Sequence, residues 1–452
     1  MALPQRDGFS GRFGVLAAAA GSAVGLGNIW RFPYITGENG GGAFLLIYLF
    51  FILAIGIPVM LSEFVIGRRS QSNALGSFKK LSPGSSWWLI GLMGIIAAFV
   101  ILSFYSTVSG WTLEYIFQAA ASGFDGKNME QLNTEFVAFT SGSFRPVFWQ
   151  IIFMALTAVV VLAGVQKGIE KYTKILMPAL LILIIIICIR SLSLPGAKAG
   201  LEFLFVPDFD KITGQSILLA LGQAAFSLSI GMGALITYGS YIRKDTPLLG
   251  TAVQVATVDT LIAVLSGVMI FPALFAMGES PAGGPGLVFV TLPKIFQSMP
   301  GGYFFSIAFF ILLSVAALTS TISVLEVVVA YMKEELKMSR LKATLIGGIS
   351  ITAIGVLCTL SFGPLKDFTI FGKTVFDLMN YMSANIFLTF GALFIVIYTG
   401  WKLGKSNFIN EINEGGKVHP LIATILVFII KFIAPIAVGA VAIGAFFIEG
   451  LM

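Results

Sequence analysis

Long apolar stretches separated by short polar loops occupy nearly the whole chain. About 20 apolar residues are needed to cross roughly 30 Å of hydrocarbon as a helix. Stretches of sufficient length lie near residues 13–36, 42–67, 87–121, 147–165, 169–190, 215–242, 248–277, 301–335, 342–362, 375–400 and 420–447. Since a helix satisfies its own backbone hydrogen bonds in lipid, the pattern predicts an all-α membrane protein with eleven transmembrane helices.

Two segments rich in small residues interrupt these stretches near their middle. The first runs from Ser22 to Asn28 and the second from Ser227 to Gly233, and each contains two glycines. A glycine costs about 1 kcal/mol in a helix interior relative to alanine. Glycines also allow close helix packing, which is the alternative explanation for either segment alone. Two such segments, five spans apart, favour deliberate breaks in the first and sixth helices.

Breaks at corresponding positions predict two inverted five-helix repeats around a binding site at the bilayer midplane. We expect the first repeat to occupy residues 1–190 and the second residues 215–400. Residues 401–452 would supply the eleventh helix and the loop before it.

Lysine and arginine are distributed unevenly between the predicted loops. If the amino terminus is cytoplasmic, eighteen of these residues lie on the cytoplasmic side and eight on the other. The positive-inside rule therefore predicts a multi-pass protein of the cell (inner) membrane with a cytoplasmic amino terminus and, after eleven spans, an extracytoplasmic carboxyl terminus. The same asymmetry explains the net charge of +6 without a nucleic-acid partner.

Composition argues against an enzyme. The chain is 57% hydrophobic and 11% charged, as expected for a protein whose solvent is a lipid bilayer. Cys188 and Cys358 lie in apolar stretches and are expected to be buried thiols. His419 is the single histidine, so the sequence offers no histidine cluster for metal or hydrolytic chemistry.

The residues around the first break resemble the first-helix signature of the neurotransmitter:sodium symporters. The matching segment runs from Gly21 to Pro33, with Trp30 and Arg31, and continues from Gly37 to Phe44. Further matches are Gly56–Pro58, Glu63, Gly67–Arg68, Ser109–Thr112, Gln223–Ser229, Ile236–Tyr238 and Leu318–Ser320. The resemblance covers most of the chain and is to a bacterial subset with eleven rather than twelve spans.

The resemblance implies two sites for co-transported sodium. Sodium site 1 would use Ala23, Asn28, Ser227 and Asp259, and sodium site 2 would use Gly21, Val24, Ala316, Thr319 and Ser320. Carbonyl and hydroxyl oxygens freed at a helix break suit a hard cation. Hydroxyls in membrane helices also bond back to their own helix, which is the alternative role of Thr319 and Ser320.

Asp259 stands where the family usually has asparagine. Chloride-dependent members place chloride near sodium site 1 to supply negative charge, and an aspartate supplies that charge itself. We therefore expect transport that is independent of chloride.

The resemblance also indicates the class of substrate. Gly25 occupies a position where monoamine carriers have an aspartate, and Tyr105 resembles the tyrosine that binds the substrate carboxylate. The predicted substrate-binding residues are Ser22, Ala23, Gly25, Leu26, Gly27, Ile101, Tyr105, Phe226, Ser227, Ser229, Met232, Ser320, Ser323 and Val324. Their side chains are apolar or carry hydroxyls, so we expect a hydrophobic, aliphatic or aromatic, L-α-amino acid.

Gates and a hinge follow from the same resemblance. Arg6 and Glu334 would form the inner gate. Arg31 would form the outer gate with Asp377 or Asn380, the latter standing where the family usually has aspartate. Gly168 and Pro178 match a pattern associated with local unwinding that opens sodium site 2 to the cytoplasm. Glu114, Glu326 and Lys431 have no role in this scheme beyond buried pairing or snorkelling.

The sequence thus predicts a sodium-coupled symporter that carries its amino acid into the cell by alternating access. A proton-coupled amino-acid permease, an amino-acid sensor without transport and a channel remain alternatives. Two bound sodium ions, a hydrophobic amino acid and the bilayer are the expected partners.

Overall fold

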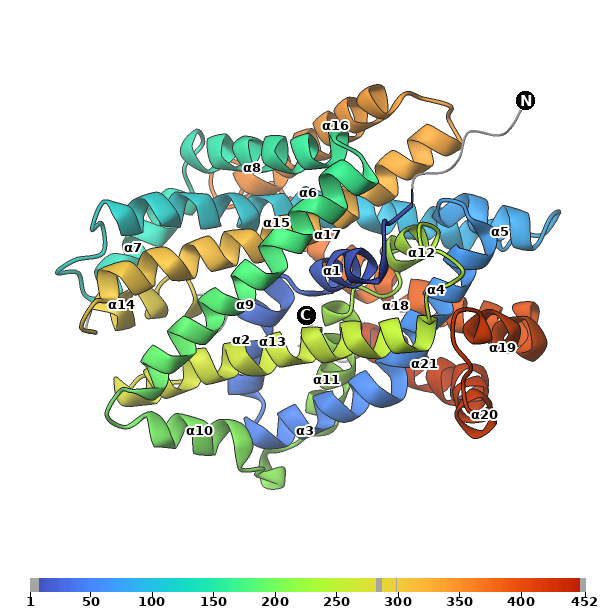
Figure 1. The fold of residues 1–452 in the computed structure, drawn as a ribbon. Coiled ribbons are helices and arrows are strands. Elements are labelled where there is room, and N and C mark those ends of the chain that lie inside the picture. Colours follow the sequence, from blue (N-terminus) through green and yellow to red (C-terminus); the bar gives the residue numbers. More distant parts are fainter. Residues whose placement is uncertain (1–7, 282–286, 298, 448–452) are drawn as a thin grey trace.

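A computed structural model describes residues 8–281, 287–297 and 299–447, and nearly all of them are helical (Figure 1). Within this part of the chain the β-type pairing amounts to two isolated bridges, Gly41 with Pro207 and Ile370 with Lys373. The expected all-α class is confirmed.

Apart from two short helices in the predicted loops, at 74–81 and 129–140, the helices of the predicted first repeat lie largely within the apolar stretches. They are α1 (Arg12–Ala23), η1 (Gly27–Arg31), α2 (Phe32–Glu38), α3 (Gly42–Phe51), η2 (Ile52–Gly56), α4 (Ile57–Ser70), α5 (Ala74–Leu81), α6 (Trp88–Ala120), α7 (Met129–Thr140), α8 (Arg145–Leu162), η3 (Val165–Glu170) and α9 (Lys171–Leu192). The η segments in this group are π-helical turns within longer helices.

The rest of the described chain is also built from helices. Its helices are α10 (Ala197–Phe205), η4 (Phe209–Lys211), α11 (Gly214–Ser227), α12 (Ala234–Gly239), α13 (Leu248–Ala276), α14 (Thr291–Gln297), α15 (Gly302–Glu334), α16 (Arg340–Leu360), α17 (Val375–Tyr381), η6 (Met382–Leu388), α18 (Thr389–Ile397), η7 (Tyr398–Leu403), α19 (Lys405–Asn413), α20 (Pro420–Phe428), η8 (Ile429–Ile433) and α21 (Ala434–Phe447).

Nine helical stretches of the described residues are long and apolar enough to cross a membrane, and the bent pair α1 and η1–α2 raises the number to ten. The remaining predicted span is divided between α11 and the six-residue α12. The count of eleven crossings and the repeat boundaries therefore stay predictions.

Both predicted interruptions break their helices. The axis bends by 50° between α1 and the η1–α2 segment. Between α11 and α12 the backbone has positive φ at Ser229 (54°), Gly231 (90°) and Gly233 (75°). A Cβ at Gly231 would lie 2.2 Å from the Leu388 carbonyl oxygen, so glycine is required there by both conformation and space.

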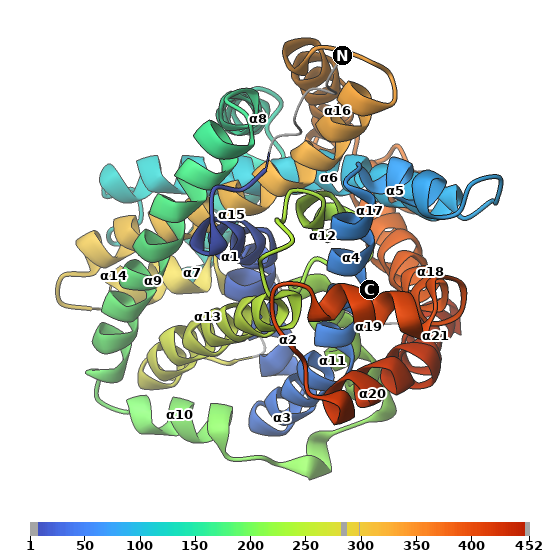
Figure 2. The ribbon, with the colours of Figure 1, turned by 45° about the vertical axis from the view of Figure 1, so that its right-hand side comes forward.

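The broken helices lie inside the bundle. In Figures 1 and 2, α1 and α12 lie among longer helices such as α6, α13 and α15. Both α6 and α15 are 33 residues long, and they pack against each other. Their buried faces hold the side chains that meet the breaks.

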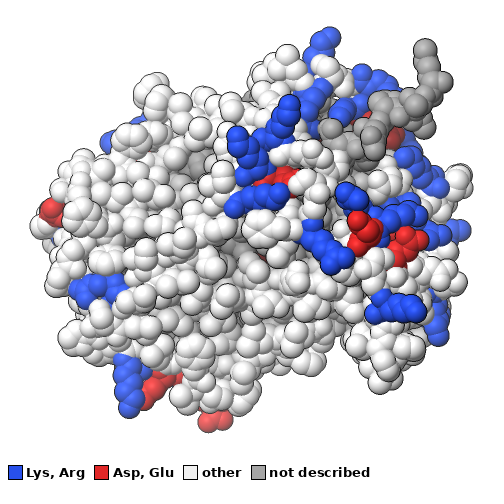
Figure 3. Space-filling model, in the orientation of Figure 1, with Lys and Arg blue, Asp and Glu red and all other residues white. Residues whose placement is uncertain are grey.

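Charge gathers at one end of the molecule. In Figure 3, lysine and arginine cluster where Figure 1 places α5 and α19, and most of the remaining visible face is uncharged. This distribution is that of a multi-pass membrane protein. Which end faces the cytoplasm stays a prediction.

The three charges without a predicted role have partners. Glu114 accepts hydrogen bonds from Arg145 and from the Trp149 indole. Buried Glu326 pairs with Arg340 at 2.6 Å and accepts a hydrogen bond from the Tyr241 hydroxyl. The Lys431 ammonium lies 4.3 Å from the centre of the Trp401 ring, a cation–π contact.

Arg68 connects three segments at the charged end. Its side chain is fully buried and donates to the Glu411 carboxylate of α19 at 2.6 Å and to the Thr246 carbonyl at 2.7 Å. Removing one partner of a buried ion pair leaves an uncompensated charge.

We predict that Glu411→Leu lowers the free energy of unfolding by about 3–5 kcal/mol, the usual cost of breaking a buried pair. Titration of the purified protein with a denaturing detergent measures it. Glu414→Gln is the control, since Glu414 pairs with Lys244 at the surface at 3.8 Å and such pairs contribute roughly 0–1 kcal/mol. Equal effects of the two substitutions would contradict the assignment.

Candidate functional site

A cavity lies between the two helix breaks, bounded on its other sides by α6, α15 and η6. Its volume is about 470 Å³, including the part open to the surface. It is lined by Ala23, Gly25, Gly27, Ile101, Leu102, Tyr105, Phe226, Ser229, Met232, Ser320, Val324 and Leu388. Ten of these twelve are predicted substrate-binding residues, and Leu102 and Leu388 are additions.

Gly25 lines this cavity close to two hydroxyl groups. A Cβ there would be 2.4 Å from the Ser320 hydroxyl oxygen and 2.9 Å from the Tyr105 hydroxyl oxygen. The neighbouring Leu26 amide donates to the Tyr105 hydroxyl at 2.9 Å. The break therefore presents backbone directly to the cavity, with a tyrosine hydroxyl beside it.

The other four predicted substrate residues do not line the cavity, but they bond to or adjoin residues that do. The Ser22 hydroxyl donates to the Ser323 hydroxyl at 2.8 Å, which joins α1 to α15. Ser229 donates to the Ser22 carbonyl at 2.8 Å and joins the two breaks. Leu26 and Ser227 belong to the same breaks.

A polar cluster joins the first break to α11 and α13 on the far side of η1. The Asn28 amide donates to the Asp259 carboxylate at 2.7 Å, to the Asp259 carbonyl at 3.1 Å and to the Ser227 hydroxyl at 3.0 Å. Ser227 donates to the other Asp259 carboxylate oxygen at 2.8 Å. Three of the four residues predicted for sodium site 1 are thus in mutual contact, and the fourth, Ala23, is the last residue of α1.

Tyr48 is part of this cluster and was not predicted. Its hydroxyl lies 3.3 Å from the Ser227 hydroxyl and 3.5 Å from the Asp259 carboxylate. Asp259 is fully buried, and no lysine or arginine pairs with it among the described residues. A buried carboxylate surrounded by hydroxyl and carbonyl oxygens fits a hard monovalent cation.

The residues predicted for sodium site 2 also come together. Thr319 donates to the Ala316 carbonyl at 3.0 Å and lies 3.4 Å from the Val24 carbonyl, to which Ser320 donates at 3.1 Å. A Cβ at Gly21 would lie 3.4 Å from the Thr319 Cβ and 3.3 Å from Cγ2 of Thr173 on α9. The break after α1 therefore contributes a carbonyl oxygen to this second site, and the middle of α15 contributes hydroxyl and carbonyl oxygens. Such a set of oxygens also suits a sodium ion.

Comparison with known proteins agrees with this geometry. The model of the sodium:neurotransmitter symporter family matches residues 6–135 and 127–449. An uncharacterized sodium-dependent transporter of Bacillus subtilis, YhdH, is 40% identical over 430 residues, with 95% of each chain covered. The chain belongs to the sodium:neurotransmitter symporter family.

More distant and solved relatives support the assignment. The sodium- and chloride-dependent taurine transporter of Bos taurus is 27% identical over 463 residues, which cover 91% of this chain and 74% of that protein. The crystal structure of MhsT in complex with L-phenylalanine shares 48% identity and a TM-score of 0.91, covering 98% of this chain and all of that one. This symporter is a multi-pass, sodium-dependent transporter, and its family consists of secondary transporters rather than enzymes.

The gate residues of the symporter are only partly brought together. Arg31 donates to the Gln223 side chain at 2.7 Å and lies 4.9 Å from the centre of the Phe226 ring. Asp377 instead accepts a hydrogen bond from Thr374 at 2.7 Å, at the start of its own helix, and Asn380 lies one turn further along α17. An outer gate between Arg31 and either residue stays a prediction.

At the opposite end Glu334 accepts hydrogen bonds from the Asn73 backbone and side chain at 2.8 and 3.0 Å. Its predicted partner Arg6 lies outside the described residues.

The predicted hinge lies where α9 begins. Gly168 is in the π-helical turn η3, and a Cβ there would lie 2.1 Å from the Val160 carbonyl oxygen. Pro178 lies inside α9. Between them, Glu170 accepts a hydrogen bond from the Ser10 amide at 2.8 Å and so connects this turn to the segment before α1. Unwinding at this turn stays a prediction.

We predict that Gly25→Ala weakens binding of labelled leucine by about 5- to 150-fold, because a methyl group would overlap the Tyr105 and Ser320 hydroxyls and overpacking costs roughly 1–3 kcal/mol. Scintillation proximity binding with purified protein measures it. Gly348→Ala is the control, since a Cβ there meets nothing within 4 Å. Unchanged binding in Gly25→Ala would place the substrate elsewhere.

Proposed function

We propose that this symporter carries hydrophobic L-α-amino acids into the cell with two sodium ions, without needing chloride. The observation that carries the proposal is the cavity between the breaks, because its lining contains apolar and hydroxyl side chains but no charged one. L-phenylalanine in the MhsT structure, a protein similar over almost the full length, supports the same class.

The broken helices provide opposite electrostatic environments for the two charged groups of an amino acid. Helix amino termini favour anions and carboxyl termini favour cations. A carboxylate is therefore expected near the start of η1, beside the Tyr105 hydroxyl, and an ammonium near the carboxyl ends of α1 and α11. The substrate side chain then faces Ile101, Met232 and Val324.

Sodium binding and substrate binding share structural elements in this arrangement. Gly25 lines the cavity, and its amide donates at 3.0 Å to the side-chain oxygen of Asn28, which belongs to the Asp259 cluster. Ser320 lines the cavity and also contacts the Val24 carbonyl of sodium site 2. An ion that orders either break therefore orders part of the substrate site, which is the physical basis of coupling.

The energy available matches concentrative uptake. At about 100 mV a sodium ion gains roughly 2.3 kcal/mol electrically, and a tenfold gradient adds about 1.4 kcal/mol. Two ions then supply about 7 kcal/mol, enough for roughly a 10⁵-fold substrate gradient.

We expect uptake of labelled leucine, phenylalanine and tryptophan into proteoliposomes that carry an inward sodium gradient, measured with potassium in place of sodium as reference. Thr319→Ala should abolish it, because it removes an oxygen at sodium site 2. Equal uptake driven by a proton gradient without sodium would indicate a proton-coupled permease. Substrate binding without uptake would indicate a sensor.

Chloride dependence provides a separate prediction. We expect that replacing chloride by gluconate leaves uptake by the unchanged protein intact, because Asp259 supplies the negative charge beside sodium. Asp259→Asn removes that charge and should make uptake require chloride. Asp210→Asn, at an exposed position, is the matched control. Chloride dependence of the unchanged protein would refute this assignment for Asp259.

A further inference from the structure

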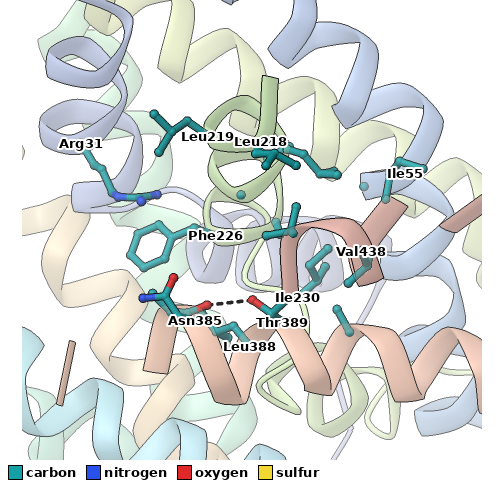
Figure 4. A pocket seen from close by; sticks show the side chains of 18 residues that line it. Arg31, Ile55, Leu218, Leu219, Phe226, Ile230, Asn385, Leu388, Thr389 and Val438 are labelled. Atoms are coloured by element: carbon teal, nitrogen blue, oxygen red, sulfur yellow. Dashed lines mark hydrogen bonds between the residues drawn. The ribbon is translucent and has the colours of Figure 1, made fainter. Parts of the chain in front are cut away.

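A second cavity lies beside the substrate cavity, between α11, η2, the η6–α18 segment and α21 (Figure 4). Its volume is about 760 Å³, including the part open to the surface. Phe226 and Leu388 line both cavities and so form a shared wall. We call it the crevice.

One end of the crevice is polar. Arg31, Phe226 and Asn385 succeed one another along this end in Figure 4. Arg31 is partly exposed, and its contacts among the described residues are the neutral Gln223 side chain and the Phe226 ring. Asn385 is 8% exposed, and its side-chain amide forms no hydrogen bond with other described residues. A cation whose one acceptor is neutral and an amide without a hydrogen bond to the described residues therefore face the same space.

The rest of the crevice is aliphatic. Its walls are formed by Leu218 and Leu219 of α11, Ile55 of η2, Ile230, and Val438 and Val441 of α21. Gly222 leaves a gap in this wall, since a Cβ there would meet nothing within 4 Å.

We propose that the crevice binds a long-chain fatty acid, with its carboxylate on Arg31 and Asn385 and its hydrocarbon chain along the aliphatic wall. An ionised carboxylate accepts hydrogen bonds from a guanidinium and an amide together. A second amino acid fits less well, because none of the crevice residues carries an acidic side chain for its ammonium group. The surrounding bilayer is the natural source of an amphiphile of this kind.

Binding in the crevice has a consequence for the shared wall. A hydrocarbon chain packed against Phe226 and Leu388 holds both side chains against the substrate cavity. The fatty acid therefore opposes any displacement of Phe226 and Leu388 that substrate entry requires, so we expect it to act as a non-competitive inhibitor. This effect on uptake rests on the proposed transport function, whereas binding itself does not.

The test is equilibrium binding of labelled dodecanoate to the purified full-length protein in phosphatidylcholine nanodiscs, with empty nanodiscs subtracted. Gly222→Leu fills the gap in the wall and should weaken binding about tenfold or more. Gly214→Leu is the matched control, because Gly214 lies on the same helix, outside the crevice and equally open, and should bind as the unchanged protein does. The affinity of Arg31→Gln for dodecanoate should also fall about tenfold or more, since the substitution removes a charge-assisted hydrogen bond.

Two ligands identify what the crevice recognises. Dodecanol, which lacks the carboxylate, should compete poorly, and leucine should not displace dodecanoate. The proposal would be overturned if Gly222→Leu and Gly214→Leu bound dodecanoate equally well. It would also be overturned if dodecanol competed as well as dodecanoate, or if leucine displaced dodecanoate from Gly25→Ala. Dodecanoate should reduce the maximal rate of leucine uptake in Gly214→Leu but not in Gly222→Leu. Binding without uptake by any variant would instead count against the transport function alone.

Discussion

Every backbone N–H and C=O in the hydrocarbon region must find a partner within the protein, because an unsatisfied group there costs several kcal/mol. Two helices of this chain stop in the middle of the bundle and leave such groups free. Side chains from other helices take over: Glu63 accepts from the Gly231 amide at 2.7 Å, and the Tyr105 hydroxyl accepts from the Leu26 amide at 2.9 Å. The breaks persist because α4 and α6 supply these acceptors.

The groups that stabilise the breaks are the groups that a substrate or an ion would contact. Asn28 connects the Gly25 amide to Asp259, and Ser320 connects α15 to the Val24 carbonyl. A ligand can exchange these contacts for its own without exposing any backbone group to lipid. A small set of side chains thereby links the binding of ions, the binding of substrate and the geometry of the breaks.

The sequence predicts those parts of the site that have a local signal. Gly25 and Gly231 mark positions where a side chain would collide with neighbouring atoms. The family motifs predict that Asn28 and Asp259 meet. Tyr48 and Leu388 carry no such signal, because a tyrosine or leucine in an apolar stretch looks like any core residue. The contact of Arg31 with Gln223 was not predicted either, because nothing in the sequence shows that these two polar side chains, 192 positions apart, meet.

Asp259 and Arg31 are buried or partly buried, form no ion pair among the described residues, and both act on η1. Asp259 contacts Asn28, Ser227 and Tyr48, all neutral, and Arg31 contacts neutral Gln223 and Phe226. Asn28 and Arg31 are three residues apart on η1, so both charges act on the same short helix. Because a charge in a low-dielectric interior is costly alone, each position favours an ion of opposite sign from outside the chain. A cation bound beside Asp259 and an anion bound beside Arg31 would therefore both act on η1, and linkage would then require that each changes the affinity for the other wherever η1 has more than one position.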